Sequence, residues 1–306
     1  MFKKRFPHLA AALQALFVTF LWSTSWVLMK IGLQDIPALT FAGLRYGLAF
    51  ACLLPFALGR LPSARPARLQ SLRELSGRGW ARLVVLGLLF YAATQGAVFL
   101  GLAYLPSVTV SLLLNFTTIA IALMGIPLLA ERPTLLQWGG VLLNIVGVMI
   151  YFYPLSIPAS QAFGLIVVII GVLANAASSL LGRRINREGD VPPLTVTVVS
   201  MGTGAAVLLA AGGLIQGFPH LTPTHWAIIG WLAVVNTAFA FTLWNHTLRT
   251  LSAMESSIIN STMLVQIAVL AWLFLGERLT WREIIGMALA GLGALIVQLR
   301  RWQPQP

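Results

Sequence analysis

The chain has 306 residues, of which 58% are hydrophobic and 9% are charged, whereas a soluble globular protein carries about 25% charged residues. A chain of this composition cannot cover its surface in water, which excludes a soluble protein and predicts one that lies in a bilayer. The formal net charge of +12 is interpreted as a signal of membrane topology and not as a nucleic-acid-binding surface.

Ten apolar runs of about 20 residues follow one another along the chain, each long enough to cross a hydrocarbon core of roughly 30 Å. We therefore predict an all-α integral membrane protein with ten transmembrane helices. The first run is long and leads into a second, so we expect a retained helix and not a signal peptide. The predicted spans are residues 11–33, 37–58, 81–102, 107–129, 135–153, 162–182, 194–215, 225–248, 253–275 and 281–299.

The basic residues are distributed unevenly over the connections between these spans. If the N-terminus is cytoplasmic, 16 of the 20 Lys and Arg residues fall on the cytoplasmic side, and the exceptions are Lys30, Arg45, Arg278 and Arg282. The positive-inside rule therefore predicts that both termini are cytoplasmic. We expect a multi-pass protein of the cell inner (plasma) membrane. The single Cys52 offers neither a disulfide nor a cysteine metal site.

The sequence "LAERPTLLQWGG" at residues 129–140 returns as "LGERLTWREIIG" at residues 275–286, a shift of 146 positions. The same shift aligns Ser111 with Ser257 and Gly147 with Gly293. We predict two five-helix repeats, residues 1–153 and 154–306. Because five is odd, the second repeat begins on the opposite face of the membrane, and such inverted repeats are typical of alternating-access transporters.

The repeated stretch itself is predicted to be structural, although a direct role in gating is the alternative. Thr134 with Gln137, and Thr280 with Glu283, have the T-x-x-Q/E spacing of a capping box, which satisfies backbone donors at a helix start. Glu131 and Glu277 are expected at the membrane edges, where an ion pair or a cap costs little.

Several of these features resemble the EamA-type carriers of the drug/metabolite transporter superfamily. The resemblance rests on the turns "AERPT" and "GERLT" and on the opening helix "FLWSTSWVLMKIGL". It also rests on the second helix, where Pro37 is followed by Arg45 at a spacing one residue longer than in the family. It implies two inverted five-helix halves and a transport function. The tryptophan-rich helices most resemble the aromatic and neutral amino-acid exporters of that superfamily.

Polar and aromatic side chains inside the spans are the candidates for a substrate site. Polar residues in the hydrocarbon region tend to face the bundle interior or a water-filled cavity, although any single one can simply bond to a neighbouring helix. Trp22 and Trp26 recur on one helix face with Lys30, and a stacking wall is favoured over a lipid-facing role. The predicted substrate-binding residues are Trp22, Trp26, Tyr91, Gln95, Ser111, Asn115, Asn175, Ser178, Asn236, Phe241, Trp244 and Asn260.

Three charged or ionisable residues are candidates for the pathway. Arg45 lies deep in the second span, where it attracts a substrate carboxylate or locks its helix to backbone carbonyls; both alternatives stay open. Lys30 is near the outer edge, where snorkelling is the alternative. His246 lies inside a span, near its cytoplasmic end, whereas His225 is only the first residue of the same predicted span.

No Asp or Glu falls near the middle of a predicted span, whereas proton-coupled pumps usually place an acid in the pathway. We therefore expect export of small metabolites, above all aromatic and neutral amino acids, by alternating access through a central cavity without proton coupling. The alternative is an exporter of drugs or other metabolites driven by a proton gradient.

Two other functional classes fit less well. A membrane enzyme needs a nucleophile or metal constellation, but His8, His220, His225 and His246 are scattered. A channel is typically a ring of subunits, whereas an internal inverted repeat builds a carrier from one chain. We expect no enzyme activity, no cofactor, no metal and no nucleic-acid partner. The expected partners are an amino-acid-like substrate and the lipid bilayer, and the protein is expected to function as a monomer.

Overall fold

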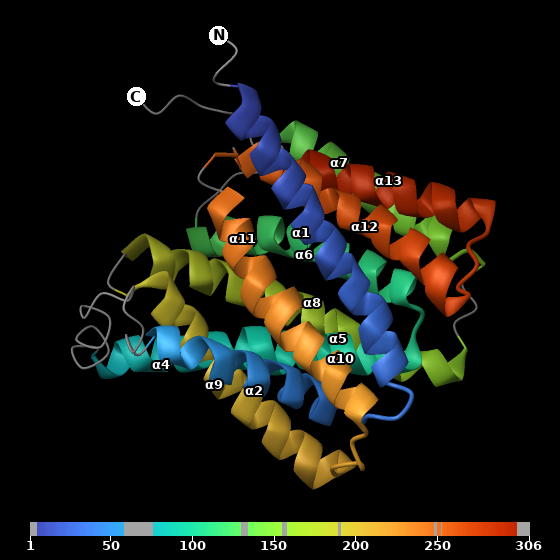
Figure 1. Ribbon diagram of the computed structural model, residues 1–306. Helices are drawn as coiled ribbons and strands as arrows, with labels where there is room; N and C mark the ends of the chain where they lie inside the picture. The colour runs from blue at the N-terminus through green and yellow to red at the C-terminus, as the bar shows by residue number, and fades with distance from the viewer. Residues whose placement is uncertain are drawn as a thin grey trace. The chain divides into compact units, whose positions relative to one another are not determined.

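The computed structural model describes residues 5–57, 76–129, 134–154, 158–188, 191–247, 250–251 and 253–298. Within these ranges all regular structure is helical (Figure 1). The described residues form ten helices. Their bounds are α1 (Arg5–Gly32), α2 (Ala38–Ala57), α4 (Gly77–Gly87) continued by η2 (Leu88–Gln95) and α5 (Gly96–Tyr104), α6 (Ser107–Leu129), α7 (Leu135–Tyr151), α8 (Ala159–Glu188), α9 (Pro193–Ala211) continued by η3 (Gly212–Gln216), α10 (Pro223–Ala233) continued by η4 (Val234–Phe239) and α11 (Ala240–Thr247), α12 (Ala253–Leu275) and α13 (Trp281–Gln298).

The helices α6 and α12 have the bounds that the apolar runs predict. The largest differences lie at the start of α1 and the end of α8, where each helix continues six residues beyond the predicted span. Both extensions carry basic residues. An apolar run ends where charges begin, but helical hydrogen bonding continues past that point, since it does not depend on an apolar environment.

Seven of the ten helices are long and apolar enough to cross a membrane. They are α1, α2, the continuous helix of α4, η2 and α5, then α6, α8, α9 with η3, and α12. The helix α7 is apolar but shorter. A crossing by α7, by α10 with η4 and α11, and by α13 stays a prediction. The protein is an all-helical, multi-pass membrane protein.

The chain forms two compact units, and each unit draws on both sequence repeats. The first unit contains Met1–Val27, Pro106–Ala162 and Ala240–Pro306, and the second contains Leu28–Leu105 and Phe163–Phe239. The compact units therefore do not coincide with the two predicted repeats, since each predicted repeat contributes segments to both units.

In the first unit, α7 and α13 lie side by side and approach each other at glycines (Figure 1). A Cβ atom added at Gly140 would lie 2.8 Å from the carbonyl oxygen of Gly293, and one added at Gly286 would lie 2.6 Å from that of Gly147. Early residues of α7 thus face late residues of α13, so the two helices run antiparallel. The 146-residue shift exchanges these two contacts, as an approximate two-fold axis requires.

The centre of this helix pair is occupied by Asn144 and Ala290, which correspond to each other under the same shift. The Asn144 Nδ2 atom donates to the carbonyl oxygen of Ala290 at 2.7 Å, and both side chains are fully buried. Because residues of the two repeats face their own counterparts here, the approximate axis passes between Asn144 and Ala290.

In the second unit, α2 packs along α9, and glycines again set the separation. A Cβ atom added at Gly43 would lie 2.8 Å from the backbone nitrogen of Leu209. The Thr40 hydroxyl donates to the carbonyl oxygen of Gly217 at 2.9 Å. The backbone nitrogen of Leu39 donates to Gln216 Oε1 at 2.8 Å, so residues that end η3 satisfy donors at the start of α2.

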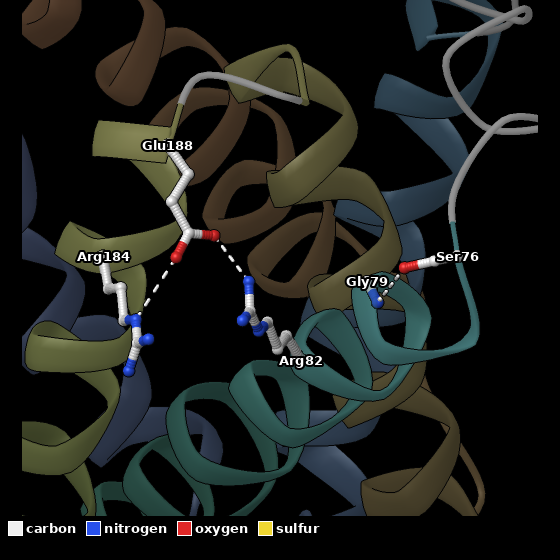
Figure 2. A network of polar contacts seen from close by, with 5 residues as sticks. All are labelled: Ser76, Gly79, Arg82, Arg184 and Glu188. Carbon is white, nitrogen blue, oxygen red and sulfur yellow. Dashed lines mark hydrogen bonds and ion pairs between the residues drawn. The ribbon is translucent and has the colours of Figure 1, made fainter.

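Also in the second unit, the carboxylate of Glu188 on α8 pairs with Arg82 on α4 (Figure 2). Glu188 accepts from Arg82 at 2.5 Å through one oxygen and from Arg184 at 3.2 Å through the other. The Ser76 hydroxyl accepts from the backbone nitrogen of Gly79 at 3.2 Å and caps α4. All three charged side chains are partly exposed, so the pairs contribute at most about 1 kcal/mol each.

Three of the helices contain wide π-helical turns, η2, η3 and η4, and two of these turns lie at equivalent places. The segment η2 begins at Leu88 and η4 begins at Val234, again 146 positions apart. Turns of this kind are rare and are frequently found at functional sites. Both turns carry polar residues within apolar helices, Tyr91 and Gln95 in η2 and Asn236 and Thr237 in η4.

Candidate functional site

Aromatic side chains gather between α1 and α11 in the first unit. The Trp22 ring centroid lies 5.2 Å from that of Phe241 and 5.2 Å from that of Trp244, with tilted rings in both pairs. Trp22 and Trp244 are half-buried, whereas Phe241 is 40% exposed. Trp26, one turn further along α1, is buried. The sequence-predicted residues Trp22, Phe241 and Trp244 therefore form one group, which we call the tryptophan cluster.

The side-chain amide of Gln266 on α12 forms hydrogen bonds to α1. Gln266 Nε2 donates to the hydroxyls of Thr19 at 3.2 Å and Thr262 at 3.0 Å, and Gln266 Oε1 accepts from Ser23 at 2.9 Å. Gln266 was not among the predicted site residues, although an amide in an apolar helix was a visible signal. Its partners were not visible, because Thr19 and Ser23 lie more than 240 residues away in the sequence.

The remaining predicted residues of the first unit have different surroundings. The Ser111 hydroxyl donates to the carbonyl oxygen of Val108 at 2.9 Å, and Asn115 Nδ2 donates to that of Ser111 at 2.9 Å. Asn115 is therefore bound to its own helix through its amide nitrogen. Asn260 and His246 are exposed.

The second unit contains a tyrosine cluster on α2 and η2, made of Tyr46, Tyr91 and Gln95. Tyr46 donates its hydroxyl to Gln95 Oε1 at 2.8 Å, and its ring centroid lies 5.3 Å from that of Tyr91. Both tyrosines are buried. Tyr91 and Gln95 were predicted from their spacing, but Tyr46 was missed, because its partner Gln95 lies 49 positions away in the sequence.

Arg45 is the deepest charge described in the second unit. It lies about 10 Å along α2 from Ala38 at 1.5 Å per residue and is 6% exposed. Its Nε and Nη2 atoms lie 3.4 Å from Thr237 Oγ1, and its Nη1 atom lies 3.1 Å from Met29 Sδ. The guanidinium carbon lies 5.2 Å from the Tyr46 ring centroid. Among the described residues, no carboxylate lies within 4.0 Å of Arg45 and no backbone carbonyl accepts from it.

Lys30 has a different environment from Arg45. Its Nζ atom donates to the carbonyl oxygens of Leu102 at 2.5 Å and Leu105 at 2.7 Å, at the end of α5. A cation is stabilised at a helix C-terminus because the last carbonyl groups have no partner within the helix. Lys30 therefore caps α5, a role that the expectation of simple snorkelling did not include.

The other predicted residues of the second unit lie on α8 and η4. The Ser178 hydroxyl donates to the carbonyl oxygen of Asn175 at 2.8 Å, which ties it to its own helix. Asn236 is fully buried beside Thr237, whose hydroxyl donates to the carbonyl oxygen of Leu232 at 2.8 Å, five residues earlier. A bond to the fifth preceding residue fits the π-helical geometry of η4.

The expected capping residues make the reciprocal hydrogen bonds of capping boxes. Gln137 Oε1 accepts from the Thr134 nitrogen at 2.9 Å, while Thr134 Oγ1 accepts from the Gln137 nitrogen at 3.3 Å. Thr280 and Glu283 do the same at 2.6 and 3.3 Å. Glu131 lies outside the described residues.

Glu277 caps a helix far from it in sequence. Its two carboxylate oxygens accept from the backbone nitrogens of Ser107 at 2.7 Å and Val108 at 3.2 Å. These groups are at the start of α6, where free donors and the helix dipole favour an anion.

Replacing Glu277 by alanine is expected to lower the free energy of unfolding by about 1–2 kcal/mol, because two backbone donors of α6 lose their acceptor. Thermal unfolding of the purified protein in detergent measures the change, and E277Q should fall between E277A and the parent. The control variant is R278A, because Arg278 is exposed and adjacent to Glu277, and its unfolding temperature should equal that of the parent. If E277A unfolds at the parent's temperature, the cap does not stabilise α6.

The described residues include no group of three or more His, Cys, Asp or Glu side chains that could hold a metal ion. The two clusters instead offer aromatic rings, amides, hydroxyls and one guanidinium. Such groups bind and orient a small molecule, but they provide no constellation for a covalent reaction.

The family model described as "EamA-like transporter family" matches the chain twice, at residues 9–153 and at residues 162–299. The chain belongs to the EamA-like transporter family. It is therefore a membrane transporter of a small-molecule substrate and not an enzyme. Two successive matches of similar length indicate that the halves of this EamA-like transporter are duplicated.

Relatives of this EamA-like transporter span nearly its whole length or most of it. The "Uncharacterized transporter YoaV" of Bacillus subtilis is 25% identical over 90% of this chain and 92% of its own. The "Uncharacterized inner membrane transporter YedA" of Escherichia coli K12 is 25% identical over 81% of this chain and 78% of its own. One chain of a solved crystal structure has the same fold, with a TM-score of 0.65 at 19% identity over 94% of this chain and 97% of its own.

Proposed function

We propose that this transporter exports aromatic and neutral amino acids from the cytoplasm across the inner membrane by alternating access. The observation that carries the proposal is the tryptophan cluster, Trp22, Phe241 and Trp244, on helices that also carry uncharged polar groups. Aromatic rings bind apolar and aromatic side chains, with roughly 1 kcal/mol per ring contact beyond the area buried. Amides and hydroxyls supply neutral hydrogen bonds to the polar groups of an amino acid.

In this proposal the two five-helix halves, residues 1–153 and 154–306, are inverted relative to each other. The antiparallel contact of α7 with α13 supports this, because it joins equivalent helices of the two halves about an approximate two-fold axis. Inverted repeats of this kind place substrate sites near the middle of the bilayer. The basic residues support cytoplasmic termini, and one chain suffices for function.

The tyrosine cluster and the polar residues of η2 and η4 also contact the substrate in this proposal. The supporting observation is that both wide turns fall at equivalent positions and carry buried polar residues. We propose the same role for Ser111, Asn115, Asn175, Ser178 and Asn260, which supply neutral hydrogen-bonding groups.

Transport by the purified protein in liposomes tests this function. Labelled phenylalanine, tryptophan and leucine are expected to exchange with unlabelled amino acid in a saturable way that prefers the L form, whereas sugar nucleotides are not. A pH gradient alone should drive little uphill accumulation, since no acidic residue lies in the middle of a span. Uphill uptake that collapses with a protonophore would contradict uncoupled exchange and support the proton-driven alternative.

A further inference from the structure

The hydrogen bonds of Arg45 leave most of its binding capacity unused. A guanidinium has five N–H donors and keeps its charge in proteins. The acceptors that Arg45 meets among the described residues are one hydroxyl and one thioether sulfur, Thr237 Oγ1 and Met29 Sδ. The two hydroxyl contacts, at 3.4 Å, are longer than ordinary N–H···O bonds. The hydroxyl also donates its own proton to Leu232.

A buried charge of this kind requires an anion or several strong acceptors, because neither lipid nor apolar side chains can replace the water that it has lost. Lys30 in the same unit meets this requirement through two backbone carbonyls at the end of α5. Arg45 does not meet it in the described part of the chain, although it is buried more deeply.

We propose that Arg45 binds the carboxylate of the transported molecule and thereby selects carboxylate-bearing substrates. This inference rests on the proposed function, since it names the substrate group that is recognised. The planar fork of a guanidinium matches a carboxylate with two parallel hydrogen bonds. Tyr46, whose ring lies beside the Arg45 guanidinium and whose hydroxyl bonds to Gln95, links this anion site to the tyrosine cluster.

The position of Arg45 also suits a site that is filled only during transport. It lies on α2, next to the wide turn η4 that supplies Thr237. A bound carboxylate pairs with the guanidinium within the span, and the pair is lost when the substrate leaves. A purely structural arginine that ties α2 to η4 would affect every substrate equally.

The test compares a carboxylate-bearing inhibitor with an analogue in which the carboxylate is replaced by an amide. We expect the wild-type transporter in liposomes to bind 3-phenylpropionate about tenfold more tightly than 3-phenylpropanamide, measured by inhibition of phenylalanine exchange. The variant R45Q should lose about tenfold or more in affinity for the acid while changing by less than about twofold for the amide. R45K should lie between them, because a lysine provides the charge without the fork. The control variant is R184Q, because Arg184 on α8 is an exposed arginine far from the proposed site in sequence.

Equal losses for acid and amide in R45Q would overturn the proposal and show a structural tie. If R45Q does not fold, the wild-type comparison decides alone, since a transporter that binds the acid and the amide equally well has no carboxylate site. If the protein exchanges other organic acids but no amino acid, the measurement is repeated with such an acid and its amide. In that case the proposed amino-acid function fails while the role of Arg45 is still decided.

Discussion

Replacing Gly140 by leucine is expected to abolish the folded transporter, whereas the same replacement at Gly139 should be tolerated. A Cβ atom at Gly140 would meet the backbone of α13, with the Gly293 oxygen at 2.8 Å, while one at Gly139 meets nothing within 4 Å. Backbone cannot move aside as a flexible side chain does. We therefore expect G140L to lower the free energy of unfolding by about 3 kcal/mol or more.

The two variants make the same chemical change at neighbouring positions of one helix, so hydrophobicity and helix propensity cancel in the comparison. The measurement is the fraction of monodisperse protein extracted from membranes, together with its thermal unfolding temperature. G286L, at the equivalent position of α13, should behave like G140L because its Cβ would lie 2.6 Å from the Gly147 oxygen. A folded, thermally unchanged G140L would show that the two helices do not approach each other at these glycines.

Replacing Trp22 by alanine is expected to reduce exchange of aromatic amino acids by roughly tenfold, through the loss of its stacking surface. The change removes the residue that contacts both Phe241 and Trp244. Y91A and N115A should reduce exchange in the same direction. W22F should keep part of the activity, because a smaller ring still stacks. Initial rates of exchange in liposomes with equal protein content measure the effect.

The matched control is W272A, since Trp272 is 59% exposed on α12 of the same unit and its loss should leave exchange unchanged. Substitutions at Gly291 and Leu292 of α13 should affect expression before they affect transport. If W22A, Y91A and N115A all transport like the parent at equal expression, the predicted substrate residues are wrong.

The helices were predictable because a lipid-spanning segment must be apolar along its whole length. The bounds of α6 and α12 follow from that pattern alone. The wide turns η2 and η4 were not predictable, since an extra residue in a helical turn leaves no mark in composition. Their equal offset of 146 positions is a property of the backbone and not of the residue pattern.

The candidate site was predictable as a set of residue types and not as a set of contacts. Tyr91 and Gln95 stood out because polar groups are rare in apolar helices, but their neighbour Tyr46 belongs to a helix almost 50 residues earlier. The sequence around Glu277 indicates a local role in its own turn, but its carboxylate accepts hydrogen bonds from the start of α6, 170 positions away. Which helices meet is decided by packing over the whole unit, which a local pattern does not encode.

The pairing of Asn144 with Ala290 has a consequence for how such a chain can diverge. Two identical five-helix subunits of opposite orientation could associate through the same antiparallel contact, but the residue on the axis would then meet its own copy. With asparagine at this position in both subunits, the two side chains would crowd each other. With alanine in both, no side-chain amide would be present to form the hydrogen bond. A fused chain escapes this restriction, because one half supplies the amide and the other supplies the small side chain and the carbonyl oxygen that receives it. The covalent link therefore permits an asymmetric lock that a dual-topology homodimer cannot form.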